Sequence, residues 1–166
     1  MPSILALSVS IGGLGAVATY LALGPLSAIL QIWIIFIAWG CFFASGGNTE
    51  GLKGAIFGHV LGSILAAIAL ILISKVAVGP VTAPVWIGIT VAVLVYASTI
   101  EVFSNIPAAV YGYATTAALA LLSPMNNPMA ADLTNPVIIA IVSLVVGGVF
   151  GLLSARLAGV LGPKSE

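Results

Sequence analysis

The sequence predicts an all-α integral membrane protein with about six transmembrane helices in a single domain, residues 1–166. Three observations support this fold class. Only 5% of the 166 residues are charged and 61% are hydrophobic, whereas a soluble domain is about 25% charged. Apolar runs of about 20 residues, the length that spans a bilayer, follow one another along the chain. Small residues recur at every fourth position in several runs, which lets membrane helices pack closely.

Six apolar segments are long enough to be the predicted helices. Gly24-Pro25 ends the first and Gly46-Gly47 ends the second, while Gly79-Pro80 separates the third from the fourth, because glycine and proline break helices. Proline is tolerated in the first turn of a helix, so Pro136 fits the start of the sixth. In chain order, the predicted helices are Ser3–Leu23, Leu26–Ser45, Leu52–Lys75, Ala83–Ile100, Ile106–Leu122 and Pro136–Val160.

The fourth and fifth segments are separated only by Glu101 to Asn105, and two arrangements fit this part of the chain. They are two full spans joined by a tight turn, or the part after Pro107 is a re-entrant half-helix. Irregular backbone at membrane depth requires protein or water around it. The longest connection, Ser123 to Asn135, contains prolines and asparagines. It is predicted to be a loop, either an ordinary connection or a cover over a pore mouth.

The two halves of the sequence, residues 1–76 and 80–162, show signs of an internal repeat. Phe43-Ala44-Ser45 in the second helix aligns with Tyr113-Ala114-Thr115 in the fifth, as aromatic, alanine and hydroxyl in both. Three spans per half reverse the direction of entry, so we expect a 3+3 inverted-topology repeat; chance matches among abundant small residues are the alternative. Rows of small residues predicted to pack helices occur at Gly54, Gly58, Gly62 and Ala66, at Gly147, Gly151, Ala155 and Gly159, and at Ala108, Gly112, Thr116 and Ala120.

The few basic residues predict the orientation. With six spans, Lys53, Arg156 and Lys164 fall on one side of the membrane and Lys75 falls on the other. Loops rich in lysine and arginine stay in the cytoplasm. We therefore expect both termini to be cytoplasmic.

His59 and Glu101 are the ionisable residues most suited to chemistry within the membrane. Neutral imidazole donates and accepts hydrogen bonds, so His59 could bind a small polar solute or relay a proton. The alternative is a histidine bonded across a helix interface or facing the headgroups. A charge at the bilayer centre costs about 2.5–3.5 kcal/mol on insertion scales. Glu101 is therefore either a functional carboxylate at depth or a turn residue at the interface.

A second group of polar residues predicts a solute path where the halves meet. Phe43 and Tyr113 are expected to narrow this path, with Ser45 and Thr115 offering hydroxyl groups to a dehydrated solute. The alternative is that these side chains only pack helices together. Further candidates for lining the path follow on the same segment, namely Asn105, Pro107 and Thr116.

The sequence contains no recognisable catalytic constellation, cofactor motif or metal-ligand cluster, and its zero net charge gives no nucleic-acid footprint. We therefore expect a non-enzymatic channel or facilitator for a small, mostly neutral polar solute such as urea, ammonia, an amide or water. A proton-coupled transporter using His59 or Glu101 is one alternative, and a non-transporting membrane scaffold or partner subunit is another. Short helices with small faces also predict a homo-oligomer, a dimer or trimer.

Three motifs resemble a known family. They are Trp39-Gly40-Cys41-Phe42-Phe43-Ala44-Ser45-Gly46-Gly47, then Gly51-Leu52-Lys53-Gly54, then Phe103-Ser104-Asn105-Ile106-Pro107-Ala108. Together they resemble the small bacterial inner-membrane proteins grouped as domain of unknown function 1097, over nearly the whole chain. The resemblance implies a single-domain protein of the bacterial inner membrane, and it implies no substrate or functional residue. Urea and ammonia channels are similar in predicted architecture alone.

Overall fold

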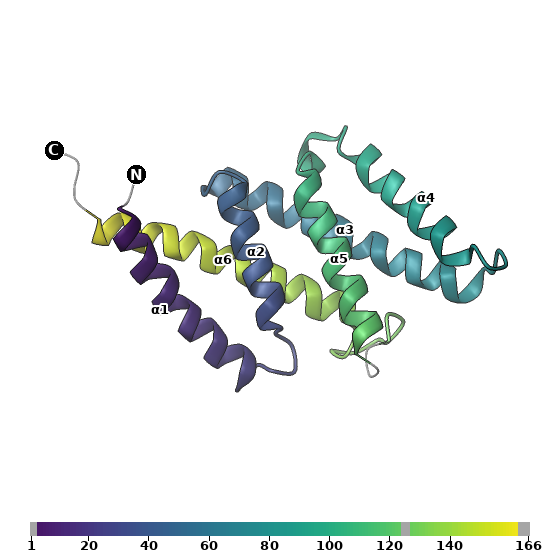
Figure 1. Ribbon diagram of the computed structural model, residues 1–166, viewed down its shortest axis with the longest axis horizontal. Helices are drawn as coiled ribbons and strands as arrows, with labels where there is room; N and C mark the ends of the chain where they lie inside the picture. Colours follow the sequence, from purple (N-terminus) through teal and green to yellow (C-terminus); the bar gives the residue numbers. More distant parts are fainter. Residues whose placement is uncertain (1–2, 124–126, 163–166) are drawn as a thin grey trace.

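The computed structural model describes residues 3–123 and 127–162, and this part of the chain is helical without a strand. The all-α prediction is confirmed (Figure 1). The elements in chain order are α1 (Ile4–Leu23), α2 (Ile32–Ala44), α3 (Thr49–Lys75), α4 (Thr82–Ala97), the 3-10 helix η1 (Glu101–Phe103), α5 (Ile106–Leu122) and α6 (Pro136–Leu161).

The start of α2 differs from the prediction. The second helix was expected from Leu26, but the chain turns after Gly24 and α2 begins at Ile32. The amide of Leu30 donates to the Leu26 carbonyl, and the amide of Gln31 donates to Ser143 Oγ at 3.0 Å. These bonds satisfy the backbone of an apolar segment outside a helix. The prediction failed here because the partner of Gln31 comes from α6.

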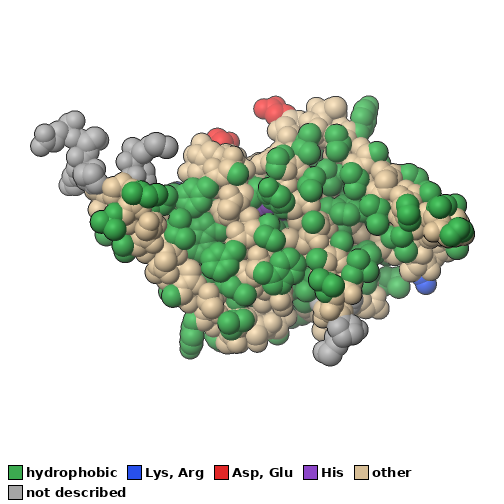
Figure 2. Space-filling view, viewed as in Figure 1, with side chains coloured by type: hydrophobic (Ala, Val, Ile, Leu, Met, Phe, Trp, Pro, Cys, Tyr) green, Lys and Arg blue, Asp and Glu red, His purple; other side chains and the backbone are tan. Residues whose placement is uncertain are grey.

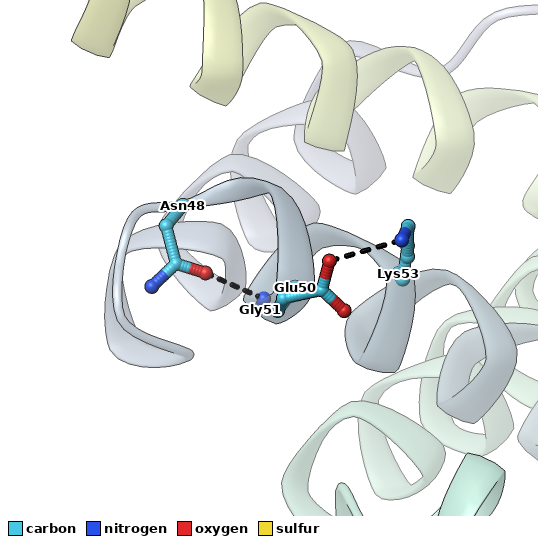
Figure 3. Close-up of polar contacts among 4 residues, drawn as sticks. All are labelled: Asn48, Glu50, Gly51 and Lys53. Carbon is cyan, nitrogen blue, oxygen red and sulfur yellow. Dashed lines mark hydrogen bonds and ion pairs between the residues drawn. The ribbon is translucent and has the colours of Figure 1, made fainter.

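Helix α3 starts earlier than the predicted Leu52. The side chain of Asn48 accepts a hydrogen bond from the Gly51 amide at 2.8 Å and so caps the helix (Figure 3). Glu50 lies in the first turn, where a carboxylate interacts favourably with the helix dipole, and it pairs with Lys53 at 2.9 Å. Both charged side chains are largely exposed.

The connection between α4 and α5 is longer than predicted. Helix α4 ends at Ala97 rather than Ile100, and η1 follows before α5 begins at Ile106. The side chain of Asn105 accepts from the Ala108 amide and caps α5. Pro136 lies in the first turn of α6, as expected from its fixed φ. Residue Lys164, used above to predict the orientation, lies outside the described residues.

Four segments of the described chain are long and apolar enough to cross a membrane, namely Ile4–Leu23, Thr49–Lys75, Gly79–Ala97 and Pro136–Leu161. The other two helices, α2 and α5, are apolar but shorter, at 13 and 17 residues. Hydrophobic side chains are spread over the whole face shown in Figure 2, and Asp, Glu, Lys and Arg side chains appear only near its edges. Exposed aliphatic and aromatic residues occur along all six helices. Such a surface is compatible with a membrane protein.

The helices pack in two close pairs. Helix α3 packs mainly against α5, and α2 packs mainly against α6, while α1 lies on α6 and α4 lies on α3. Glycine makes both pairings close. A Cβ atom on Gly62 would overlap the Ala109 carbonyl oxygen of α5, and one on Gly147 would overlap the Ile35 carbonyl oxygen of α2. The backbones therefore touch directly at both crossings.

Candidate functional site

The α3–α5 crossing positions the histidine. A Cβ atom on Gly58 would lie 2.8 Å from Ala108 Cβ, and one on Gly112 would lie 2.8 Å from His59 Cα. The carbonyl oxygen of Gly112 also accepts a hydrogen bond from Ser63 Oγ at 3.3 Å. Direct backbone contact on both sides leaves little freedom for α3 here. His59 is consequently held in a fixed place beside α5.

His59 and Thr116 carry unpaired polar atoms in the interior. His59 is 1% exposed and Thr116 is 0% exposed. Among the described residues, both ring nitrogens of His59 and Oγ1 of Thr116 are buried without a hydrogen-bond partner in the protein. Leaving a buried donor or acceptor unpaired costs about 1–3 kcal/mol. These atoms are the strongest candidates for contact with a polar solute.

A second polar group joins the end of α2 to the start of α5. Asn105 Nδ2 donates to Ser45 Oγ at 2.8 Å, and Ser45 Oγ lies 3.8 Å from Cys41 Sγ. The Asn105 amide therefore both caps α5 and bonds to another helix. Pro107 lies in the first turn of α5, so its missing N–H leaves no broken helical bond.

The aromatic residues expected to narrow a common path lie in different apolar clusters. Phe43 packs against the cluster of α1, α2 and α6 that contains Trp39. Tyr113 packs against the cluster of Leu65, Leu94 and Ala109, and its hydroxyl lies 2.9 Å from Thr90 Oγ1. The structure does not bring Phe43 and Tyr113 together in one of these clusters.

The two hydroxyls expected to serve a solute already have partners. Thr115 Oγ1 donates to the Tyr111 carbonyl of its own helix at 2.7 Å, and Ser45 Oγ accepts from Asn105. Thr116, the next residue, is the threonine whose hydroxyl is unpaired. The sequence alone does not indicate which of two adjacent threonines donates its hydroxyl to a backbone carbonyl.

A family model described as "Protein of unknown function (DUF1097)" matches residues 8–159. The chain belongs to the DUF1097 family. The match begins within α1 and ends within α6, so it includes every candidate residue named above. No curated protein and no solved structure was found to match this DUF1097 protein.

Two of the hollows on the surface of this DUF1097 protein involve residues discussed above. One of about 530 Å³ is lined by residues of α3 and η1, among them Glu50, Lys53 and Glu101. Glu101 is exposed in η1 rather than buried in a long helix. The other hollow, of about 630 Å³, is lined by residues around the end of α5 and the start of α2, among them Gln31 and Trp33.

Several polar contacts of the interior were not predicted from the sequence. Trp39 Nε1 donates to Ser154 Oγ at 3.0 Å in a buried bond between α2 and α6, and Thr90 contacts Tyr113 between α4 and α5. Isolated serine and threonine residues in apolar runs were the available signal. Their partners became identifiable only with the helix pairing.

Proposed function

We propose that this DUF1097 protein is a membrane channel or facilitator for a small, mostly neutral polar solute that passes His59 and Thr116. The observation that carries the proposal is the set of unpaired, buried polar atoms on these two side chains. In a membrane interior, polar side chains without partners are costly and commonly mark a solute path. Imidazole and hydroxyl together offer donors and acceptors to an uncharged solute that has lost its water.

The proposal includes six membrane crossings with both termini in the bacterial cytoplasm. Helices α2 and α5 are about 20 and 26 Å long at 1.5 Å per residue, and a bilayer thins locally around short helices. Successive helices alternate in direction in Figure 1, and the start of α1 lies beside the end of α6 at its left. With six crossings, Lys53 near the start of α3 would lie on the same side as the start of α1 and the end of α6, with Lys75 on the other side, as the positive-inside rule favours.

The proposal also includes the inverted repeat, which matching contacts support. Gly58 of α3 approaches Ala108 and Asn105 of α5, and Gly147 of α6 approaches Ala38 and Ile35 of α2. The two α2 residues are spaced as the two α5 residues are. Aligning the aromatic residues Phe43 and Tyr113 also places Ala38 on Ala108. The sequence alignment and the packing therefore give the same register.

A proton-coupled carrier is the second candidate function, and the unpaired ring nitrogens of His59 favour it. A histidine without a fixed partner can take up a proton from a solute or a water chain. Glu101 is less suited to this role because it is exposed in η1. We further propose that the protein works as a dimer or trimer, because homo-oligomers usually have closed rotational symmetry.

Flux into proteoliposomes tests the proposed site through the two adjacent threonines. Urea, formamide, methylamine and water serve as probes. Thr116→Val keeps the shape and removes the unpaired hydroxyl, so loss of about 1 kcal/mol of hydrogen bonding should lower flux of the transported probe roughly fivefold. Thr115→Val is the matched control, because its hydroxyl already bonds to the backbone of α5.

Three outcomes separate the candidate functions. Equal effects of Thr115→Val and Thr116→Val would remove Thr116 from the path. A flux driven by a pH gradient and abolished in His59→Ala would identify the coupled carrier. No flux of any probe above empty vesicles would leave the protein as a scaffold or partner subunit.

A further inference from the structure

The helices form two lobes that do not coincide with the two halves of the sequence. Helices α1, α2 and α6 form one lobe, because α6 packs mainly against α2 and α1. Helices α3, α4 and α5 form the other, because α3 packs mainly against α5 and α4 packs mainly against α3. Helix α3 also packs against α6 of the first lobe, about as extensively as against α4. In Figure 1, α1 and α4 lie at opposite ends of the molecule. Each half of the sequence thus contributes helices to both lobes.

Two apolar clusters and two polar bonds follow the same division. Trp39 belongs to a cluster drawn from α1, α2 and α6, and it bonds to Ser154 within that lobe. Leu65, Leu94 and Ala109 form a cluster within the other lobe, where Tyr113 contacts Thr90. Each lobe therefore has an apolar cluster of its own, while other buried clusters join residues of both lobes.

The unpaired polar groups stand where the lobes meet. His59 is one helical turn after Ala55, which packs against Cys41 of the opposite lobe. Thr116 is one turn before Leu119, which packs against Ile34 and other residues of α2 and α6. Both candidate residues belong to the α3–α4–α5 lobe, and both are closed to solvent. In this structure, therefore, neither side chain is accessible from the surface.

The connection from α2 to α3 passes between the lobes and contains two glycines with positive φ. Gly46 has φ 102° and Gly47 has φ 65°. The connection from α3 to α4 stays within one lobe, and it contains Gly79 with φ 66°. Glycine adopts these conformations at no steric cost. Gly47 and Gly79 thus share a backbone conformation but differ in whether they join two lobes.

We infer that this protein opens its buried site by rocking the α1–α2–α6 lobe against the α3–α4–α5 lobe about Gly46 and Gly47. The inference rests on the proposed solute function of His59 and Thr116, and it adds how that site is reached. Packed units move as rigid bodies, and hinges are a few residues that absorb the change in backbone angles. The Asn105–Ser45 bond, which joins the lobes beside this hinge, is broken in the open state.

Distances between spin labels test which units move. Tyr20→Cys in α1 is paired with Leu157→Cys in α6, which lies in the same lobe but the other half. It is also paired with Ile68→Cys in α3, which lies in the same half but the other lobe. All three positions are exposed, and the native Cys41 is buried. The labelled protein is measured in nanodiscs, with and without urea.

We expect the 20–157 distance to keep one narrow distribution in both conditions. The 20–68 distance should show a second population or a shift of more than about 2 Å, the size of a domain rearrangement. A shift of the 20–157 distance with a fixed 20–68 distance would mean that the sequence halves move instead, and would overturn the inference. One fixed, narrow distribution for both pairs would overturn it as well.

A pair of hinge variants tests the role of Gly47. A Cβ atom on Gly47 meets Phe43 only at ordinary contact, 3.5 Å, and one on Gly79 meets nothing within 4 Å. Gly47→Ala and Gly79→Ala therefore impose the same backbone strain without a clash. Only Gly47→Ala should change the 20–68 distribution, and equal effects of the two variants would exclude the hinge.

The two experiments fail separately from the solute function. Lobe motion is measured without any flux. A 20–68 distance that changes in a protein that transports no probe would support the lobe motion and contradict the proposed function. If flux depends on Thr116 but the label distances stay fixed, the proposed function is supported and the lobe motion is excluded.

Discussion

The contact between α3 and α5 gives the sharpest stability prediction, for Gly62→Ala. The added Cβ atom would lie 2.6 Å from the Tyr113 amide nitrogen and would overlap the Ala109 carbonyl oxygen. Non-bonded atoms prefer a separation of about 3.5–4.0 Å, so α3 and α5 must move apart by more than about 1 Å. Both obstacles are backbone atoms, which cannot rotate away.

Gly62→Ala should lower the free energy of unfolding, because overpacking a tight interior costs about 1–3 kcal/mol. Gly159→Ala in α6 is the matched control, since its Cβ atom would meet nothing within 4 Å. Both glycines lie inside helices, so the gain in helix propensity is the same and cancels in the comparison. The free energy of unfolding of Gly62→Ala should therefore be about 2 kcal/mol lower than that of Gly159→Ala.

Unfolding by sodium dodecyl sulfate, followed by circular dichroism in detergent micelles, measures this difference. Wild type and both variants are compared in the same mixed micelles. Equal unfolding midpoints for Gly62→Ala and Gly159→Ala would show that α3 and α5 do not touch at Gly62, and the whole helix pairing would then be in error.

Two further predictions concern the interior and the topology. Ser154→Ala leaves Trp39 Nε1 buried without an acceptor and should cost about 1–3 kcal/mol; in a Trp39→Phe background the same change should cost far less, and equal costs in a double-mutant cycle would mean that the bond is absent. Reporter fusions after Gly47 and after Gly79 should give opposite signals, cytoplasmic for the first, and matching signals would contradict six crossings.

Helix boundaries were predictable where the chain itself supplies the signal. Gly24-Pro25 ends α1, and Pro136 opens α6, because glycine and proline restrict the backbone locally. Asn48 caps α3 in the structure, whereas the apolar rule placed the start of this helix at Leu52. Local chemistry was thus a better guide than hydrophobicity at this boundary.

Other features depend on contacts between distant residues and could not be read from the sequence. The delayed start of α2 involves the bond between Gln31 and Ser143 of α6. Both His59 and Thr116 were candidate residues, but only the packing shows that their polar atoms lack partners while Thr115 has one. Hydrophobic periodicity gives helices, whereas their pairing depends on shape at the crossings.

The third helix of each sequence half, α3 or α6, packs mainly against a helix of the other half. This arrangement has a consequence for biosynthesis. When the ribosome has made α1, α2 and α3, neither α2 nor α3 has its main neighbour, because these are α6 and α5. The lobe completed by α5 can form first, and on the proposed membrane topology α1 and α2 lack their main neighbour until α6 is inserted. If the nascent chain is released before residue 136, the face of α2 that packs against Gly147 stays uncovered. We expect membrane quality control to degrade such a chain.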